Sequence, residues 1–474
     1  MLLLLSGFIA APKAVAADAG PDQYYTLDRL PDPDTNLKLE VGGLNFAADG
    51  TLYAGTRRGE VWAWKDGKWK RFASGLAECL GTLPIKPGVV LVTQRAEVTR
   101  LIDTDGDGIA DRYEKITNDF AYSGNYHEFN FGLVMDKAGN LYGSLNLGHT
   151  NHDPWGGQYM GADVKDRGTV YTISPDGKYS TFAWGLRSPN GLEISPDGEL
   201  FCAESQGEFT ATDCLQHLQK DRFYGHPASL SFKPGFTGNP RTTTIAELAK
   251  MRTPPIVWFP YKRVGQSVNQ PRFDITAGKF GPFAGQIFCG DDIGPILTRV
   301  FLEKVGDDYQ GACFPFLRKQ NVLEGANRIA FGPDGAMYTG LTNRGWATGT
   351  HGVYKIAWTG KMPLEIQKWE IQSDGFLLTF TEPVNEQAAS NPDNYHLLNF
   401  HYEYHKTYGC DELDKAPVKV LSAKVSADRK SVHLALPELR SVWIYQLDVQ
   451  NVTADDGAGI RNSTGWYTLN RLKQ

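Results

Sequence analysis

The stretch from Asn190 to Glu204, NGLEISPDGELFCAE, joins two short alternating segments through a Pro-Asp-Gly turn. Apolar and polar residues alternate on both sides of the turn, and this period of two residues is typical of half-buried antiparallel strands. An Asp-Gly pair supplies the backbone angles that a tight hairpin turn requires. The stretch therefore predicts a β-hairpin, and the fold depends on how often that hairpin recurs.

The same hairpin pattern recurs along residues 40 to 358. Clear copies are LNFAADGTLYAG from Leu44, FGLVMDKAGNLYGS from Phe131 and NRIAFGPDGAMYTG from Asn327, and degenerate copies begin at Gly81 and Pro271. Six units of short strands are typical of a β-propeller, whose blades bury their faces against one another. We therefore predict an all-β chain built on a six-bladed β-propeller. A β-sandwich is the second interpretation. It ranks below the propeller because six like units would be unusually many for one sandwich.

The two ends of the chain add further segments to this plan. The stretch QYYTLDRL from Gln23 is predicted to supply a strand that closes the last blade. After residue 360 the pattern changes to closely spaced strands, which suit an immunoglobulin-like β-sandwich and are similar to bacterial Ig-like modules. The predicted organisation is a signal peptide over 1–16, the propeller over 23–360 and the Ig-like sandwich over 363–474.

The N-terminus predicts export. Leu2 to Ala11 form a short apolar run, and Ala14-Val15-Ala16 supplies the small residues of a signal-peptidase site, although no Lys or Arg precedes the run. The run is far shorter than the roughly 20 apolar residues of a membrane span. We therefore predict a periplasmic or secreted protein with no transmembrane span. A net charge of −6 with no long run of either sign excludes a nucleic-acid footprint.

The cysteine pattern gives little support to a disulfide framework. Six cysteines are few for 474 residues. Cys202 with Cys214 and Cys289 with Cys313 are locally feasible pairs, and buried free thiols fit the sequence equally well. No Cys-x-x-Cys-His motif is present, which excludes covalent c-type haem on this chain.

The stretch DTDGDGIADRYE from Asp103 matches a twelve-residue EF-hand calcium loop. Its expected ligands are the side chains of Asp103, Asp105, Asp107, Asp111 and Glu114 and the carbonyl of Ile109. So many carboxylates repel one another without a cation, and calcium is the hard cation abundant outside the cytosol. A strand rather than a helix precedes the loop, so we predict a structural calcium staple. A metal-free acidic turn is the alternative.

Polar residues precede the innermost strand of most units, where the chain of a propeller meets the central axis. They are Glu78, His127, Glu128, Asn130, Arg187, Asn190, Asn269, Gln270, Asn327 and Arg328, and Asp291 and Asp292 end a strand of the fifth unit. A loop anchor is the simpler interpretation of any one of them. As a set they predict a polar axial pocket, in which Glu128, Asn130, Asn269, Asp291 and Asp292 are the candidate substrate contacts.

Several of these stretches resemble a known family. The segments GLRSPNGLEISPDGELFCAESQGE, RFYGHP and YHEFNFGLVMDKAGNLYGS are similar to the soluble, quinone-dependent glucose and sorbosone dehydrogenases, which are β-propellers. The likeness covers Asn45 to Ala357 loosely and Trp184 to Pro227 well. The segments GKFGPFAGQIFCGDD, YQGACFPF and YHKTYGCDE also resemble large secreted dehydrogenase-like proteins of planctomycete-type bacteria.

The resemblance implies a cofactor and residue roles. The cofactor would be pyrroloquinoline quinone, and the matching cofactor-binding residues are Arg187, Asn190, Asn327 and Arg328. The guanidinium of Arg187 suits a carboxylate or quinone oxygen of this cofactor. His127 matches the general base that takes the proton from the sugar hydroxyl. The family's asparagine after the arginine is Ser188 here, and the acid that orients the histidine falls near Leu147.

Three hypotheses of function follow. The first is an exported oxidoreductase that oxidises a sugar or sugar aldehyde with pyrroloquinoline quinone, using His127 and Arg187 as catalytic residues and a separate electron acceptor as partner. The second is a non-redox propeller that binds or cleaves carbohydrate at the same polar face. The third is a structural or surface-binding protein with calcium-stabilised loops.

Overall fold

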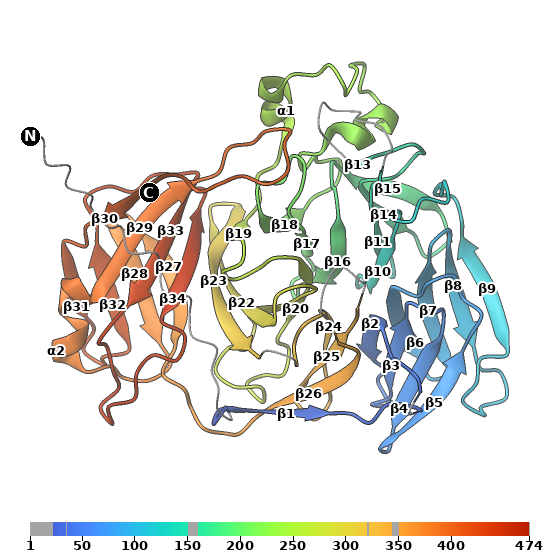
Figure 1. Cartoon of the computed structure of the whole chain (residues 1–474), viewed down its shortest axis with the longest axis horizontal. Helices are drawn as coiled ribbons and strands as arrows, with labels where there is room; N and C mark the ends of the chain where they lie inside the picture. Colours follow the sequence, from blue (N-terminus) through green and yellow to red (C-terminus); the bar gives the residue numbers. More distant parts are fainter. Residues whose placement is uncertain (1–21, 35, 150–159, 320–321, 344–349, 474) are drawn as a thin grey trace, which may run out of the picture.

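The computed structural model of the chain describes residues 22–34, 36–149, 160–319, 322–343 and 350–473. Antiparallel sheets surround a central axis, and a second group of sheets lies beside this ring (Figure 1). The predicted signal peptide over 1–16 lies outside the described residues. Within the described ranges, no helix is long and apolar enough to cross a membrane.

Six four-stranded units make up the ring, which confirms the predicted six-bladed propeller. The first three are β2 (Val41–Phe46), β3 (Leu52–Thr56), β4 (Val61–Lys65) and β5 (Lys68–Ala73); β6 (Gly81–Lys86), β7 (Val89–Gln94), β8 (Glu97–Ile102) and β9 (Arg112–Thr117); and β10 (Asn130–Met135), β11 (Leu141–Leu145), β14 (Thr169–Ile173) and β15 (Tyr179–Trp184). The last three are β16 (Pro189–Ile194), β17 (Leu200–Glu204), β18 (Asp213–Leu218) and β19 (Val257–Phe259); β20 (Val268–Phe273), β21 (Ile287–Asp291), β22 (Ile296–Val305) and β23 (Asp308–Arg318); and β24 (Ala326–Phe331), β25 (Met337–Leu341), β26 (Gly352–Trp358) and β1 (Tyr25–Arg29).

The sixth blade is closed by the N-terminal strand, as the sequence predicts. β1 pairs antiparallel with β26, and Tyr25 lies opposite Trp358. The innermost strands then contact one another in the order β2, β6, β10, β16, β20 and β24, and β24 contacts β2. Strands from the two ends of the propeller sequence therefore complete one ring.

The hairpin from Asn190 to Glu204 forms as predicted, with one difference in burial. Gly198 adopts a φ of +99° in the turn between β16 and β17, which glycine tolerates without strain. All five residues of β17 are buried, so this strand is covered on both faces rather than on one. Neighbouring blades supply the second cover, because each sheet of a propeller lies between two others.

Close approach of inner strands depends on glycine at one contact. A Cβ atom on Gly81 in β6 would lie 1.2 Å from the carbonyl oxygen of Gly132 in β10. No side chain fits in that space, so these two inner strands meet through their backbones.

The C-terminal strands form a β-sandwich that is continuous with the fifth blade. One sheet contains β27 (Ile366–Gln372), β28 (Gly375–Phe380), β32 (Ser431–Ala435) and β31 (Ser422–Val425); the other contains β34 (Thr464–Leu469), β33 (Trp443–Val449), β29 (Tyr395–His401) and β30 (Leu413–Val418). β34 pairs with β23, which makes one eight-stranded sheet. Trp369 is fully buried in the core shared by both sheets and by residues of β23. The two predicted domains thus share a hydrogen-bonded sheet.

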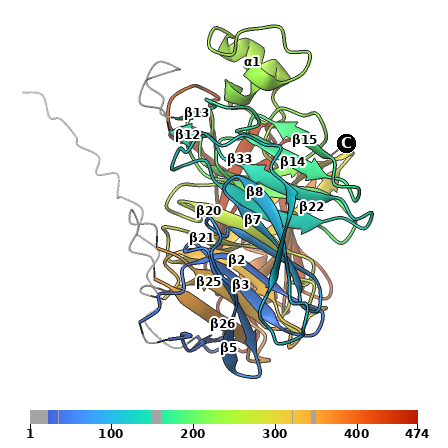
Figure 2. The ribbon, with the colours of Figure 1, turned by 90° about the vertical axis from the view of Figure 1, so that its right-hand side faces the viewer.

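A few short elements lie outside the blades. They are β12 (Gly148–His149), β13 (Met160–Gly161), the 3-10 helices η1 (Pro227–Phe232) and η2 (Pro392–Asn394), and the helices α1 (Ile245–Met251) and α2 (Glu386–Ala389). Figure 2 shows α1 and the β12–β13 pair beyond the same end of the propeller sheets. All six cysteines are free thiols, and five of them are buried.

Candidate functional site

Arg187 lies in the turn that precedes β16, at the axial end of the fourth blade. The buried Glu204 carboxylate in β17 accepts the backbone N–H groups of Arg187 and Ser188, which fixes the shape of the turn. The side chain of Arg187 is buried, and its Nε donates to Oε2 of the buried Glu208 at 2.5 Å. The turn is therefore held by one carboxylate, and the guanidinium is paired with another.

The surroundings of Arg187 are tightly packed. A Cβ atom on Gly207 would lie 1.9 Å from Nε of Arg187, so the loop can pass this close only because residue 207 is glycine. The guanidinium carbon lies 5.2 Å from the ring centroid of Tyr408, within the range of a cation–π contact. Tyr408 belongs to the C-terminal sandwich, so both modules contribute to this site.

His127 lies before β10, in the third blade, with its ring held by a backbone carbonyl. Nδ1 of His127 is 3.1 Å from the carbonyl oxygen of Leu147. A carbonyl can only accept, so Nδ1 carries a proton, and Nε2 is the ring nitrogen that can take one up. The carbonyl of Leu147 thus orients the imidazole where the resembling family uses an acid.

A second histidine accompanies His127. The Oδ1 atom of Asn125 accepts the backbone N–H groups of His127 and His149 at 3.0 and 3.1 Å. The two imidazole rings meet edge to face, with centroids 4.5 Å apart. Burial, followed by the charge of Arg187, lowers the pKa of His149. Arg187 is therefore near enough to His149 to act on it, and the set of His127, His149, Arg187 and Glu208 forms the axial cluster.

Three residues of this region were not predicted as site residues. Glu208 lies within the quoted ESQGE segment, His226 lies within YGHP, and His149 follows the third-blade hairpin. Burial lowers the pKa of His226 from 6.5 to about 3. Each of the three is a residue type that is common in functional sites. No motif spacing in the sequence, however, linked any of them to Arg187.

The predicted cofactor-binding asparagines meet one another at the axis. The amide of Asn190 donates to Oδ1 of Asn269, and Nη1 of Arg328 donates to Oδ1 of Asn190 at 3.0 Å and of Asn327 at 2.8 Å. All four side chains are buried. They form the axial network, in which each residue comes from a position just before or within an innermost strand.

The axial network also reaches the other blades. Asn327 donates to the carbonyl oxygen of Val41 in the first blade, and Arg328 donates to that of Leu80 at the second. The guanidinium of Arg328 lies 5.1 Å from the ring of Phe131 in the third. One arginine and three asparagines thus contact all six blades, through hydrogen bonds and one cation–π contact.

The other predicted pocket residues are engaged in loop contacts. Glu128 accepts the N–H and the hydroxyl of Ser123 and lies 3.8 Å from Arg167. Asn130 donates to the carbonyl of Gln94 and accepts the hydroxyl of Tyr171. These buried groups hold the loops around the third blade.

Asp291 is an anchor between loops of the fifth blade. Its carboxylate accepts four backbone N–H groups, those of Gln266, Ser267, Ile293 and Gly294. Burial, followed by the charge of Asp291, raises the pKa of the neighbouring Asp213 to about 8. The backbone N–H of the adjacent Asp292 donates to the carbonyl of Ser267. The Asp291 carboxylate therefore holds the backbone of the two loop segments that donate to it.

Comparison with known proteins identifies the family. Residues 64–340, more than half of the chain, match the family described as a domain of unknown function, DUF7133. The chain belongs to the DUF7133 family. The matched range contains all residues of the axial cluster and of the axial network, whereas Tyr408 lies outside it. No curated protein matches the sequence.

Solved structures share the propeller fold of this DUF7133 protein at low identity. A soluble aldose sugar dehydrogenase from Escherichia coli, in the apo form, is 16% identical with a TM-score of 0.50 and covers 70% of this chain and 99% of its own. The pyranose dehydrogenase PQQ domain from Coprinopsis cinerea, in the holo form, is 11% identical with a TM-score of 0.51 and covers 71% and 96%. A Thermus thermophilus protein described as an oxidoreductase (glucose dehydrogenase) is 19% identical with a TM-score of 0.50 and covers 70% and 99%. These likenesses establish the fold.

The acidic loop of the DUF7133 domain brings together part of the predicted ligand set. Carboxylate oxygens of Asp103, Asp105 and Asp111 lie within 4.8 Å of one another. Oδ1 of Asp107 instead accepts the N–H of Ile109 at 2.7 Å. Glu114 lies in β9, where its carboxylate pairs with Arg100 at 3.1 Å and with Arg112. Strand pairing between β8 and β9 thus directs the twelfth position of the motif away from the other three acids.

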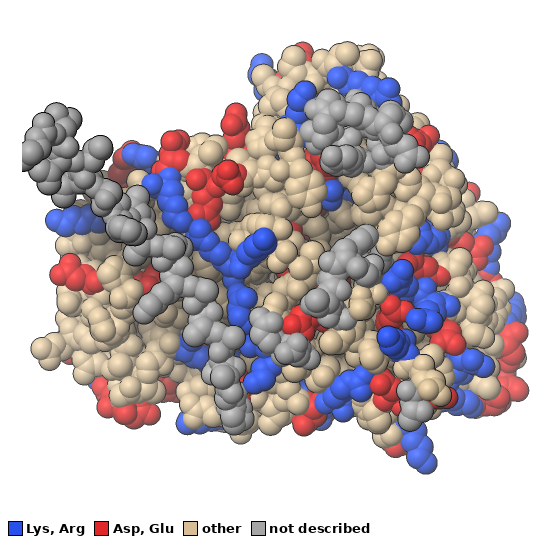
Figure 3. Space-filling view, in the orientation of Figure 1, with Lys and Arg blue, Asp and Glu red and all other residues tan. Residues whose placement is uncertain are grey.

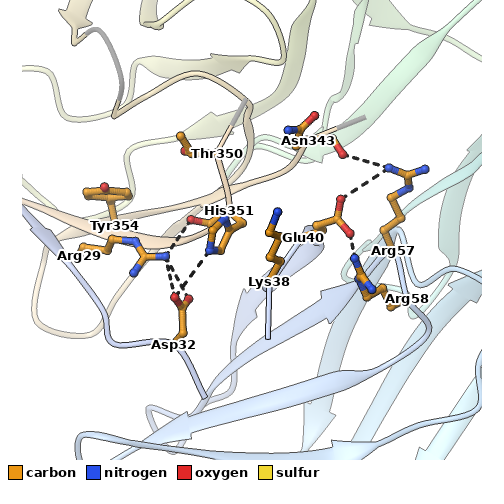
Figure 4. A pocket seen from close by; sticks show the side chains of 10 residues that line it. All are labelled: Arg29, Asp32, Lys38, Glu40, Arg57, Arg58, Asn343, Thr350, His351 and Tyr354. Atoms are coloured by element: carbon orange, nitrogen blue, oxygen red, sulfur yellow. Dashed lines mark hydrogen bonds and ion pairs between the residues drawn. The ribbon is translucent and has the colours of Figure 1, made fainter. Parts of the chain in front are cut away.

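A separate pocket lies at the junction of the first and sixth blades, where basic and acidic side chains alternate (Figure 4). Glu40 pairs with Arg57 and Arg58, and Asp32 pairs with Arg29 and His351. Figure 3 shows charges of both signs interspersed over the neighbouring blades. Two carboxylates face four cationic side chains in this pocket, so the ion pairs leave a surplus of positive charge.

Proposed function

We propose that this DUF7133 protein is an exported oxidoreductase that oxidises a sugar or sugar aldehyde with pyrroloquinoline quinone. The observation that carries the proposal is the axial cluster of His127, His149, Arg187 and Glu208. It combines a proton acceptor with a buried cation on a propeller fold shared with sugar dehydrogenases. Export rests on the predicted signal peptide.

The donors at Arg187 suit the anionic quinone. Among the described residues, only the Nε–H of Arg187 has a side-chain acceptor, so its two terminal nitrogens remain for a ligand. A guanidinium fork binds a carboxylate through two parallel hydrogen bonds. Glu208 neutralises part of the charge, and it also fixes the direction in which the fork points. When bound, the quinone would accept the hydride that leaves the sugar.

His127 can hold the proton that leaves the substrate hydroxyl. Its Nε2 atom is the acceptor, because the carbonyl of Leu147 keeps the proton on Nδ1. Proton uptake creates an imidazolium that a carbonyl dipole stabilises less than a carboxylate does. Glu128 and Asp291 are engaged elsewhere, with Ser123 and with loop amides. We therefore expect slower proton transfer than a carboxylate-supported histidine gives.

Asn190, Asn327 and Arg328 act as support in this proposal. Their contacts with each other hold the inner strands, and the turn that carries Arg187 leads directly into β16. A rigid axis keeps the two catalytic residues from different blades at a fixed separation. The resemblance assigned these residues to cofactor binding, and we propose a positioning role instead.

Calcium has a structural role in the proposal. Three carboxylates of the β8–β9 loop lie within 4.8 Å of one another, as hard oxygen ligands for this cation do. Asp103 also accepts the N–H groups of Gly106 and Gly108 at 2.8 Å, which keeps the loop compact. Glu114 does not join them, so we expect a weaker site than a complete EF-hand loop.

The test is a reconstitution assay. Purified protein with added pyrroloquinoline quinone and calcium should reduce a redox dye in the presence of some member of a sugar and sugar-aldehyde panel. Arg187→Ala should abolish the signal, and Arg429→Ala, which changes an exposed pair with Asp455, should retain it. Dye reduction with no sugar, or equal activity in Arg187→Ala, would refute the proposal. No dye reduction with any member of the panel, together with sugar-dependent thermal stabilisation without quinone, would indicate the non-redox carbohydrate hypothesis instead.

A further inference from the structure

The loop that joins β29 to β30, residues 402–412, leaves the C-terminal sandwich and reaches the propeller (Figure 1). Its backbone is hydrogen-bonded to the propeller at two points. The N–H of Gly409 donates to the carbonyl of Gly207 at 3.1 Å, and the N–H of Cys410 donates to that of Ala211 at 2.8 Å. The hydroxyl of Tyr404 donates to the carbonyl of Gly225 at 2.5 Å. This bridging loop is therefore fixed on the propeller.

A groove of about 710 Å³ lies between the bridging loop and the propeller. Tyr402 and Tyr408 line it from the loop, and Tyr261 lines it from the propeller. Tyr408 is 56% exposed and Tyr261 is 41% exposed. Aromatic rings at a groove are suited to the apolar faces of sugar rings.

The polar lining of the groove has a net negative charge. Arg263 is its one arginine and pairs with Glu412 at 2.7 Å, while Glu403 and Asp411 add two further carboxylates. Carboxylates and a guanidinium offer paired hydrogen bonds to neighbouring hydroxyl groups. An anionic ligand would be repelled by the surplus of acids. The chemistry of the groove therefore fits a neutral polyhydroxylated ligand.

Tyr408 joins this groove to the axial cluster. The same ring that lines the groove lies 5.2 Å from the guanidinium carbon of Arg187. Tyr408 also forms a β-bridge with Glu208, the partner of Arg187. A sugar chain in the groove would thus meet the same ring that contacts Arg187.

We propose that the groove beneath the bridging loop is a binding subsite for a neutral oligosaccharide, with Tyr408 as the stacking residue that connects it to the axial cluster. This inference rests on the proposed function, because it specifies the substrate class of the same site. It gives the C-terminal sandwich a share in substrate binding. The expected substrate is therefore an oligosaccharide end rather than a free monosaccharide.

Calorimetric titration of the full-length protein, without quinone or calcium, tests the subsite directly. The probes are glucose, maltotetraose and cellotetraose. At least one tetrasaccharide should bind ten times more tightly than glucose or better. Tyr408→Ala should reduce that affinity to the level of glucose, and Tyr408→Phe, which keeps the ring, should retain it within about threefold. Tyr113→Ala removes a similarly exposed tyrosine of the second blade and should change nothing.

The outcomes separate this inference from the redox proposal. Equal affinities for glucose and both tetrasaccharides, no binding of any of them, or unchanged tetrasaccharide binding in Tyr408→Ala would overturn the subsite. If dye reduction with glucose succeeds in any of those cases, the redox proposal stands without the oligosaccharide subsite. If dye reduction fails while Tyr408→Ala still removes tetrasaccharide binding, the groove is a carbohydrate site and the redox proposal fails.

Discussion

Nε of Arg187 lies 2.5 Å from Oε2 of Glu208, and both side chains are almost fully buried. The arginine of the family-like motif is thus paired with a carboxylate of the protein itself. The pair leaves the terminal nitrogens of Arg187 available and limits the charge that a ligand must match.

The Arg187–Glu208 pair should be important for stability. Glu208→Gln leaves a buried arginine without its counter-charge, and such changes cost about 3–5 kcal/mol of the free energy of unfolding. Urea denaturation of the variant and the wild type measures the difference. Asp455→Asn, which breaks the exposed pair with Arg429, is the control and should leave stability unchanged. A Glu208→Gln variant as stable as this control would contradict the buried pairing.

His127 should be needed for turnover and not for folding. His127→Asn removes the Nε2 acceptor, so the rate of dye reduction should fall by about 10²–10⁴-fold. Thermal unfolding should change little, because an asparagine amide can still donate to the carbonyl of Leu147. His433→Asn, which alters a histidine paired with Asp374 in the C-terminal sandwich, should keep full activity. Activity that survives in His127→Asn would remove the histidine from the mechanism.

Arg328 should hold the centre of the ring together. Arg328→Met leaves the amide oxygens of Asn190 and Asn327 and the carbonyl of Leu80 without this donor. Each buried polar group left unsatisfied costs about 1–3 kcal/mol, so a loss of several kcal/mol is expected in denaturant unfolding. Arg328→Lys, which keeps the charge but not the planar fork, should recover part of the loss. Stability equal to that of the wild type in Arg328→Met would show that the axial network contributes nothing.

Much of the fold followed from local sequence signals. Asp-Gly turns such as the one at Gly198 are set by backbone sterics, and they fix the hairpins regardless of what packs around them. The closing strand at Tyr25 was predicted from the architecture instead, since a ring with one blade incomplete would leave an edge exposed. The continuity of β23 with β34 was not predictable, because hydrogen bonding between strands so distant in the chain leaves no periodic signal.

The site was less predictable than the fold. Arg187 and His127 stand out by residue type and by resemblance, but their contacts depend on loops from other blades. Asn190, Asn269 and Asn327 occupy equivalent positions, which is why they were grouped as a ligand-binding set. Equivalent positions of a propeller converge on one axis, so these side chains meet one another there. Tyr408 could not be assigned, because the bridging loop contacts the propeller only in the folded chain.

The buried His226 should make stability depend on pH. Burial lowers its pKa from 6.5 to about 3, so the unfolded chain takes up a proton near pH 6.5 while the folded chain stays neutral to about pH 3. In that window the unfolded state binds more protons. The free energy of unfolding therefore decreases by about 1.4 kcal/mol for each unit by which the pH is lowered, for this group. His226→Asn can still accept the N–H of Ala228 and should fall less steeply between pH 6.5 and 4.5 in urea denaturation. Parallel curves for the two proteins would contradict the buried neutral histidine.

Binding of the quinone at Arg187 is the central claim, and equilibrium dialysis with pyrroloquinoline quinone and calcium tests it most directly. The wild type and Arg29→Met, which alters an arginine of the pocket between the first and sixth blades, should each bind one quinone per chain. Arg187→Met should bind it at least about 100-fold more weakly, because the buried charged fork is lost. If the wild type binds no quinone, or Arg187→Met binds it as tightly as the wild type, the account is wrong.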